Sequence, residues 1–132
     1  MEIMVEKEQF WLGRYDAPQQ LPEQEPCFAA WIRGEYSLLA PRLPGQPGRS
    51  QGPWACLGVS GTLDLSLVGV MERLSRCLSE AGVPLLAQST YDTDYLFVPM
   101  DRLDRAVEAL RAEGFSVRRA DGNDLAVATS NA

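Results

Sequence analysis

The chain has 132 residues, 45% of them apolar and 23% charged, which is typical of one compact domain or two small halves that share a core. A formal net charge of −6 argues against a nucleic-acid-binding surface, because binding to phosphates requires clustered Lys and Arg. The sequence contains no histidine, the commonest general base and metal ligand. We therefore expect no metal site, no cofactor and no enzymatic activity.

The first nine residues are interrupted by charged side chains, so no secretory leader is predicted there. No apolar run approaches the roughly 20 residues needed to span a bilayer. We expect a cytoplasmic protein without membrane contact. The cysteines form no CxxC pair, and we expect Cys56 (in a strand pattern) and Cys77 (on an apolar helix face) to be buried.

The first half predicts short strands separated by irregular segments. Strand patterns cover residues 9–15, 27–33 and 36–40, and Gly34 turns the chain between the last two. Three prolines in residues 16–26 prevent a regular helix throughout, and residues 41–53 have the composition of a loop. We therefore interpret residues 1–52 as a β-rich half, 53–120 as a second domain, and 121–132 as a tail in which 125–129 adds a strand to the first half.

The second half has clearer periodicity. A strand at 54–60 is followed by a helix with Ser66 as its N-cap and Gly82 as its left-handed end. Strands at 83–88 and 95–98 follow, joined through a turn at 91–93, and then come a second helix up to Gly114 and a strand at 115–119. The first helix has an apolar stripe that consists of Leu67, Val70, Met71, Leu74, Cys77, Leu78 and Ala81.

This order, βαββαβ, predicts an α+β, ferredoxin-like fold. With right-handed crossovers, two helices pack on one face of a four-stranded antiparallel sheet.

The segment Ser89-Thr90-Tyr91-Asp92-Thr93-Asp94 resembles a signature of one branch of the ACT domains, which are small-molecule sensing modules. That branch contains the CASTOR-type arginine sensors and many short bacterial proteins. Four further segments resemble the same branch in the same order: Glu35 to Leu39, Trp54, the run of Gly61, Leu63, Ser66, Leu67 and Gly69, and the corner Ala81 to Leu85.

The resemblance implies a second, degenerate ACT-like half at the N-terminus and an amino acid or similar small ligand held at an interface between ACT units. The pocket residues that it implies are Gly61, Gly69, Val70, Pro84, Leu85, Tyr91 and Asp94. A helix N-terminus suits an α-carboxylate, and Asp94 suits an α-ammonium. Pro84 lacks a backbone N–H, and no acidic residue follows Ser66 early in the predicted helix to match the one that the arginine sensors use for a guanidinium.

Simpler structural roles compete with each of these assignments. Asp94 is an equally good turn residue that bonds its own backbone, and Gly61 and Gly69 serve a loop and close helix packing. Tyr91 fits an amphipathic surface position. An acylphosphatase-like enzyme is disfavoured because residues 58–66 contain no arginine to cradle a phosphate.

The sequence therefore predicts a non-enzymatic amino-acid-binding regulatory or sensor protein. The alternative is a protein-interaction or assembly subunit that has the ACT fold and no functional pocket. We expect a homodimer, because the arginine sensors carry two tandem copies and this chain resembles one. Candidate contacts are Phe115 and Val117 at one predicted sheet edge, and Val83 and Leu85 at the other.

Overall fold

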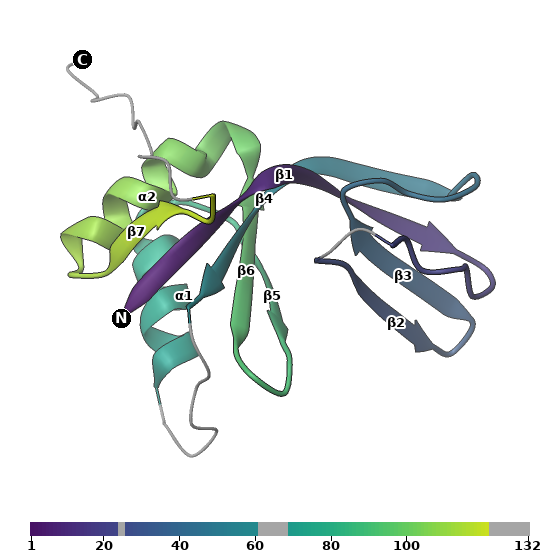
Figure 1. Ribbon diagram of the computed structural model, residues 1–132, viewed down its shortest axis with the longest axis horizontal. Helices are drawn as coiled ribbons and strands as arrows, with labels where there is room; N and C mark the ends of the chain where they lie inside the picture. The colour runs from purple at the N-terminus through teal and green to yellow at the C-terminus, as the bar shows by residue number, and fades with distance from the viewer. Residues whose placement is uncertain (24–25, 61–68, 122–132) are drawn as a thin grey trace. The chain divides into compact units, whose positions relative to one another are not determined.

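The computed structural model describes residues 1–23, 26–60 and 69–121. The chain forms two compact units: unit 1 comprises Met1–Lys7 and the residues from Ala55 onward, and unit 2 comprises Glu8–Trp54. Strands β1 (Glu2–Tyr15) and β4 (Arg49–Val59) each contribute residues to both units (Figure 1). Each unit has a hydrophobic core of its own.

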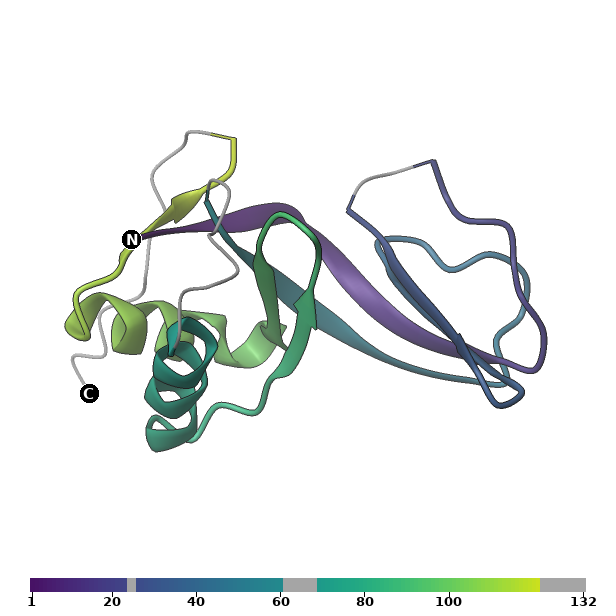
Figure 2. The same cartoon turned by 90° about the horizontal axis from the view of Figure 1, so that it is seen from below.

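Unit 1 has the order of strands and helices that the sequence predicts. After β4 come α1 (Val70–Glu80), β5 (Leu86–Ser89), β6 (Asp94–Pro99), a short 3-10 helix η1 (Met100–Arg102), α2 (Leu103–Ala112) and β7 (Ser116–Arg119). Both helices pack on the same face of the sheet (Figure 2). The predicted ferredoxin-like α+β fold is confirmed.

The first helix has the predicted phase but a later start. Leu74, Cys77 and Leu78 are buried against the sheet, and Gly82 has the left-handed φ of +74° that ends the helix. The helix begins at Val70 and its N-cap is Gly69, so the predicted start is three residues too early. Gly69 has a φ of +92°, and this left-handed residue interrupts the apolar pattern that suggested the earlier start. Ser66 itself lies outside the described residues.

The sheet of unit 1 contains a strand that the sequence analysis missed. The N-terminal part of β1 lies between β7 and β4, so the strand order is β7-β1-β4-β6-β5. This part of β1 runs parallel to β7, with Ile3 opposite Val117, so the prediction of a four-stranded, wholly antiparallel sheet is wrong. Ile3 and Val5 enter the core, while Glu2 pairs with Arg118 through contacts of 3.0 and 3.1 Å.

The core of unit 1 contains most of the side chains that the sequence analysis proposed as dimer contacts. Val83, Phe115 and Val117 are each at most 4% exposed and belong to the core of unit 1, and Leu85 packs against that core. Val83, Phe115 and Val117 therefore do not form the exposed dimer contacts that the sequence suggested, because they are buried in the core, whereas Leu85 is half-buried.

Unit 2 is built from strands, as predicted. Strands β2 (Phe28–Ile32) and β3 (Glu35–Ala40) form a hairpin through Arg33 and Gly34, whose φ values of 50° and 77° suit a two-residue turn. The strand order is β2-β3-β1-β4. The core includes Tyr15 and Tyr36, whose rings meet edge to face at 6.1 Å.

The remaining sequence predictions concern cysteines and the tail. Cys56 and Cys77 are free and buried, as predicted. The tail strand proposed for residues 125–129 lies outside the described residues. In the part of the chain that the structure describes, no helix is long and apolar enough to cross a membrane.

Candidate functional site

The turn between β5 and β6 is fixed to the rest of unit 1 by hydrogen bonds. The Thr90 N–H donates to the Thr93 carbonyl at 2.9 Å, and the Thr90 hydroxyl donates to the same oxygen at 3.2 Å. Thr93 is only 7% exposed, and its hydroxyl donates to the Val59 carbonyl at 2.9 Å. The Ser-Thr motif therefore forms a rigid hairpin end that is attached to the end of β4.

Asp94 lies at the base of this turn and is half-buried. It is paired with Ser89 across the hairpin, and the Ser89 hydroxyl donates to Asp94 Oδ1 at 2.6 Å. A hydrogen bond to a carboxylate is stronger than one between neutral groups, so Ser89 helps to fix the orientation of this side chain. The carboxylate has further lone pairs on both oxygens that can accept from an ammonium group.

The start of α1 has backbone N–H groups for which no other described residue provides an acceptor. Among the residues that the structure describes, no side chain caps this helix start, and the first helical bond runs from the Arg73 N–H to the Gly69 carbonyl at 2.9 Å. The N–H groups of the first turn therefore point out of the helix with a partial positive charge, which favours an anion. Val70 packs on the core behind this turn. Because the helix begins at Val70, Glu72 lies in its first turn, so the helix start does have an acidic residue, contrary to the sequence interpretation.

The remaining predicted residues that the structure describes are Tyr91, Pro84 and Leu85. Figure 1 shows the start of α1 and the turn after β5 at the same end of unit 1. Pro84 and Leu85 precede β5, four or more residues before Ser89 at its end, which places them about 13 Å away along the strand. Tyr91 is 86% exposed at the tip of the turn. The structure thus brings Gly69, Val70, Tyr91 and Asp94 to one end, but not Pro84 and Leu85, while Gly61 lies outside the described residues.

A hollow of about 290 Å³ lies beside the same hairpin. It is lined by Met4, Glu6, Gly58, Val59, Ser60, Asp92, Thr93 and Tyr95. The ring of Tyr95 lies against Gly58, where a Cβ atom would be only 2.9 Å from Tyr95 Cε1. The sequence analysis missed Met4 and Glu6, because only the insertion of β1 into the sheet brings them here.

Buried thiols do not add a nucleophile to unit 1. Burial raises the pKa of Cys56 well above its usual value, and the charge of Glu6 raises it further. Burial likewise raises the pKa of Cys77, whose Sγ contacts the Ala109 carbonyl at 3.2 Å. Both thiols stay protonated near neutral pH, and the thiolate is the reactive form. Within residues 1–23, 26–60 and 69–121, no group of three or more His, Cys, Asp or Glu side chains could hold a metal ion.

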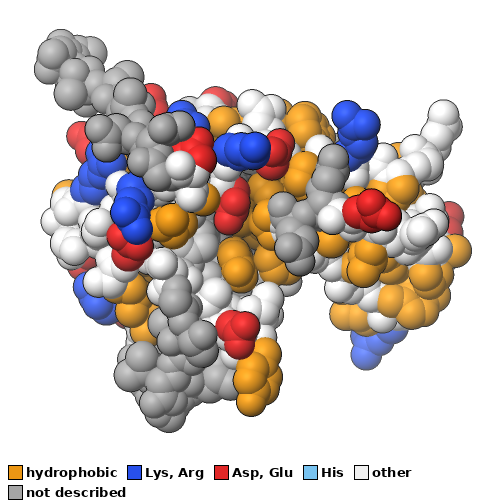
Figure 3. Space-filling model, viewed as in Figure 1, with side chains coloured by type: hydrophobic (Ala, Val, Ile, Leu, Met, Phe, Trp, Pro, Cys, Tyr) orange, Lys and Arg blue, Asp and Glu red, His pale blue; other side chains and the backbone are white. Residues whose placement is uncertain are grey.

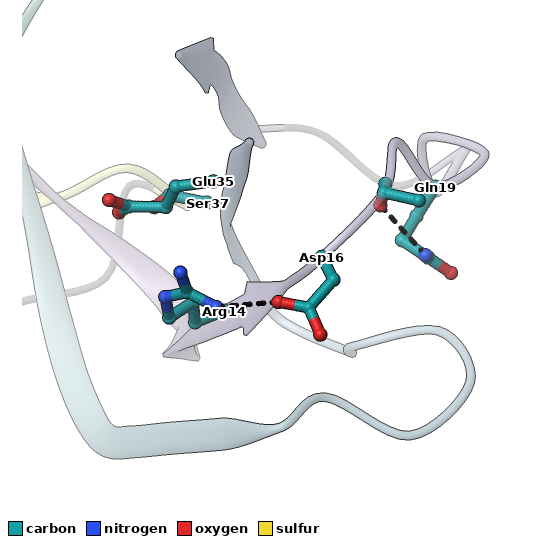
Figure 4. A network of polar contacts seen from close by, with 6 residues as sticks. Arg14, Asp16, Gln19, Glu35 and Ser37 are labelled. Atoms are coloured by element: carbon teal, nitrogen blue, oxygen red, sulfur yellow. Dashed lines mark hydrogen bonds and ion pairs between the residues drawn. The ribbon is translucent and has the colours of Figure 1, made fainter. Parts of the chain in front are cut away.

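Unit 2 carries polar contacts of its own. Arg14 donates to Asp16 at 2.9 Å, and the Ser37 hydroxyl donates to Glu35 at 2.7 Å (Figure 4). Both contacts are exposed to solvent, so they contribute little to stability. The Tyr15 hydroxyl donates to the Pro44 carbonyl at 2.6 Å, and burial raises the pKa of this side chain. Arg14 and Asp16, together with Gly48 and Arg49, also line a hollow of about 440 Å³ on unit 2.

Comparisons with known proteins agree with this fold. The model of the ACT domain family matches residues 49–112. A crystal structure of a protein from Agobacterium tumefaciens superposes with a TM-score of 0.76 at 20% identity, covering 88% of this chain and 90% of that one. The regulatory subunit of aspartate kinase from Thermus flavus superposes with a TM-score of 0.63 at 9% identity, covering 85% and 96%.

A third similar structure is a Vibrio cholerae protein of unknown function, described as a possible transport protein. Its TM-score is 0.65 at 16% identity, with 84% of this chain and 88% of that chain covered. Among curated proteins, no sequence matches this chain. Identities of this size establish the fold alone. Residues 49–112 thus match an ACT domain in sequence, and the fold is the ferredoxin-like fold of ACT type.

Proposed function

We propose that this chain is a non-enzymatic regulatory protein that binds an amino acid where two ACT units meet. The observation that carries the proposal is the start of α1, which no described side chain caps, at the same end of unit 1 as the β5–β6 turn that Asp94 follows. The free N–H groups after Gly69 suit an α-carboxylate, and the Asp94 carboxylate suits an α-ammonium. The ACT match over residues 49–112 supports a regulatory role for such a site.

The proposal includes the finer assignments that the sequence suggested. The chain is a cytoplasmic sensor related to the arginine-sensor branch, unit 2 is a degenerate ACT-like half, and a second copy completes the ligand interface as a homodimer. A ligand held between ACT units makes the site sensitive to how the units associate, which is how a sensor passes its signal to a partner.

Glu72 bears on which amino acid is bound. Its position in the first turn of α1 places a carboxylate near the proposed carboxylate site. Glu72 also lies 3.4 Å from Arg76, and both side chains are more than half exposed, so this pair is weak and the Glu72 carboxylate is free to turn toward a cationic ligand. Amino acids with a basic side chain are therefore among the first ligands to test.

A second function is favoured by a specific contact. Ser89 already donates to Asp94, which is the arrangement expected of a hairpin residue that needs no ligand. Under this alternative hypothesis, the chain is a protein-interaction or assembly subunit without a working pocket.

A thermal-shift screen against the proteinogenic amino acids separates the two functions. A ligand that binds only the folded state raises the melting temperature, by mass action. A concentration-dependent rise with one or a few amino acids supports the sensor. Unchanged melting temperatures with every amino acid at millimolar concentration support the assembly subunit.

A further inference from the structure

Strand β2 is an edge strand whose outer side carries exposed hydrophobic residues. It lies at the end of the strand order β2-β3-β1-β4 and has the sequence Phe28-Ala29-Ala30-Trp31-Ile32. Trp31 is 51% exposed and Ile32 is 62% exposed. Figure 3 shows hydrophobic side chains gathered over the part of unit 2 that contains β2 and β3. Native proteins protect such edges with charges, prolines or bulges, and β2 contains no charged residue and no proline.

The other edges of the sheet differ from β2 in this respect. Strand β7 carries Arg118 and Arg119, the four-residue β5 ends in Gln88 and Ser89, and the part of β4 in unit 2 carries Arg49 and Pro53. Charged and polar side chains of this kind discourage pairing with another chain. Of the edges that the structure describes, β2 is therefore the one suited to accept a further strand.

We propose that the outer edge of β2 pairs with the same edge of a second copy, in an antiparallel arrangement centred on Ala30. The backbone pattern of unit 2 favours this register. The two-residue turn makes Ile32 and Glu35 a hydrogen-bonded pair, so Ala30 also points its backbone groups toward β3. Ala29 and Trp31 then point their N–H and C=O groups outward. With Ala30 at the two-fold axis, Ala29 of each copy exchanges backbone hydrogen bonds with Trp31 of the other.

The side chains fit the same register. Residues that lie opposite each other share a face of the sheet, so the large Trp31 ring of one copy lies over the small Ala29 of the other. Phe28 of one copy lies opposite Ile32 of the other, which is a favourable aromatic and β-branched pair. Shifting the centre to Trp31 would oppose two indole rings and would place Ala29 opposite Arg33, which has a positive φ in the turn. The Ala30-centred pairing is therefore self-complementary, and it is favoured over the Trp31-centred one.

A disulfide test reports this register directly. Residues opposite each other in a non-hydrogen-bonded antiparallel pair have Cα atoms about 4.5 Å apart, which lies within the range that a disulfide can bridge. We expect Ala30→Cys, in a Cys27→Ser background, to form a disulfide-linked dimer under mild oxidation. Ala29→Cys is the matched control, because the two Ala29 Cα atoms would lie about 8 Å apart and cannot be bridged.

A second test measures the molecular mass in solution by light scattering. The wild-type protein should show the mass of two chains at high micromolar concentration, and Ala29→Pro should show the mass of one. Proline removes an outward N–H and leaves the bonds between β2 and β3 intact, so the variant should keep the wild-type circular dichroism spectrum. A one-chain mass for the wild type, a two-chain mass for folded Ala29→Pro, or equal cross-linking of Ala29→Cys and Ala30→Cys would each overturn the proposal.

Discussion

Thr93 and Val59 are joined by a buried hydrogen bond that links the β5–β6 turn to the end of β4. The Thr93 hydroxyl donates to the Val59 carbonyl at 2.9 Å, and Thr93 is only 7% exposed. These two residues are far apart in the chain, so the bond fixes the position of the Ser-Thr motif relative to the sheet. Asp94 follows Thr93 directly and depends on this anchor for its own position.

We expect Thr93→Val to lower the free energy of unfolding by about 1–3 kcal/mol, because the Val59 carbonyl loses its side-chain donor in a buried setting. Thr93→Ser keeps the hydroxyl and should cost less than Thr93→Val. Urea unfolding of the three proteins measures the difference. Equal stability of Thr93→Val and wild type would show that the bond does not hold the turn in solution.

The packing of α1 gives a second prediction. Leu74 is fully buried against the sheet, so Leu74→Ala should lower the free energy of unfolding by about 2–5 kcal/mol. Glu72 is more than half exposed and pairs with Arg76 at 3.4 Å, so Glu72→Ala should change stability by less than about 0.5 kcal/mol. Denaturant melts that rank the two variants in the reverse order would contradict the orientation of the helix.

Gly58 and Tyr95 form a close contact that allows a double-mutant test. A Cβ atom at Gly58 would be 2.9 Å from Tyr95 Cε1, so Gly58→Ala forces the ring to move and should cost about 1–3 kcal/mol. The same substitution in a Tyr95→Ala background should cost clearly less, because the ring that it meets is gone. If Gly58→Ala lowers the free energy of unfolding equally in both backgrounds, the Tyr95 ring is not the source of the strain.

The sequence predicted the elements of unit 1 where the periodicity was strong and local. The stripe of Leu74, Cys77 and Leu78 gave the phase of α1, and the turn residues after Ser89 gave the β5–β6 hairpin. The start of α1 was misplaced, because the apolar pattern continues before Gly69, and a backbone conformation cannot be read from that pattern.

The inserted strand was missed for a different reason. Ile3, Met4 and Val5 form an apolar run of only three residues between Glu2 and Glu6, and the partner strand β7 lies at the other end of the described chain. Pairing between such distant segments leaves no local signal. For the same reason, the sequence does not indicate that Met4 and Glu6 line the hollow beside Tyr95. The Ser89–Asp94 contact, in contrast, follows from the hairpin register and could have been found from the sequence.

The proposed role of Asp94 in the site gives a further prediction. Asp94→Asn should leave stability nearly unchanged, because the amide oxygen can still accept from Ser89. It should weaken amino-acid binding by about 1.5–3 kcal/mol, or roughly 10- to 150-fold, through loss of a charge-assisted bond. Asp101→Asn, an exposed carboxylate in η1, is the matched control and should bind as wild type. Calorimetry that finds equal affinity in Asp94→Asn would leave Asp94 as a turn residue only.

The measurement that tests the proposed function most directly is an amide chemical-shift titration of labelled protein with the amino acid that raises its melting temperature most. The account predicts the largest shifts at the start of α1, from Gly69 to Glu72, and at the hairpin residues Ser89 to Asp94, with small shifts around the start of β5. Saturating shifts at both segments with one dissociation constant would support a single site that joins them. Shifts confined to unit 2, or no shifts with any amino acid, would contradict it.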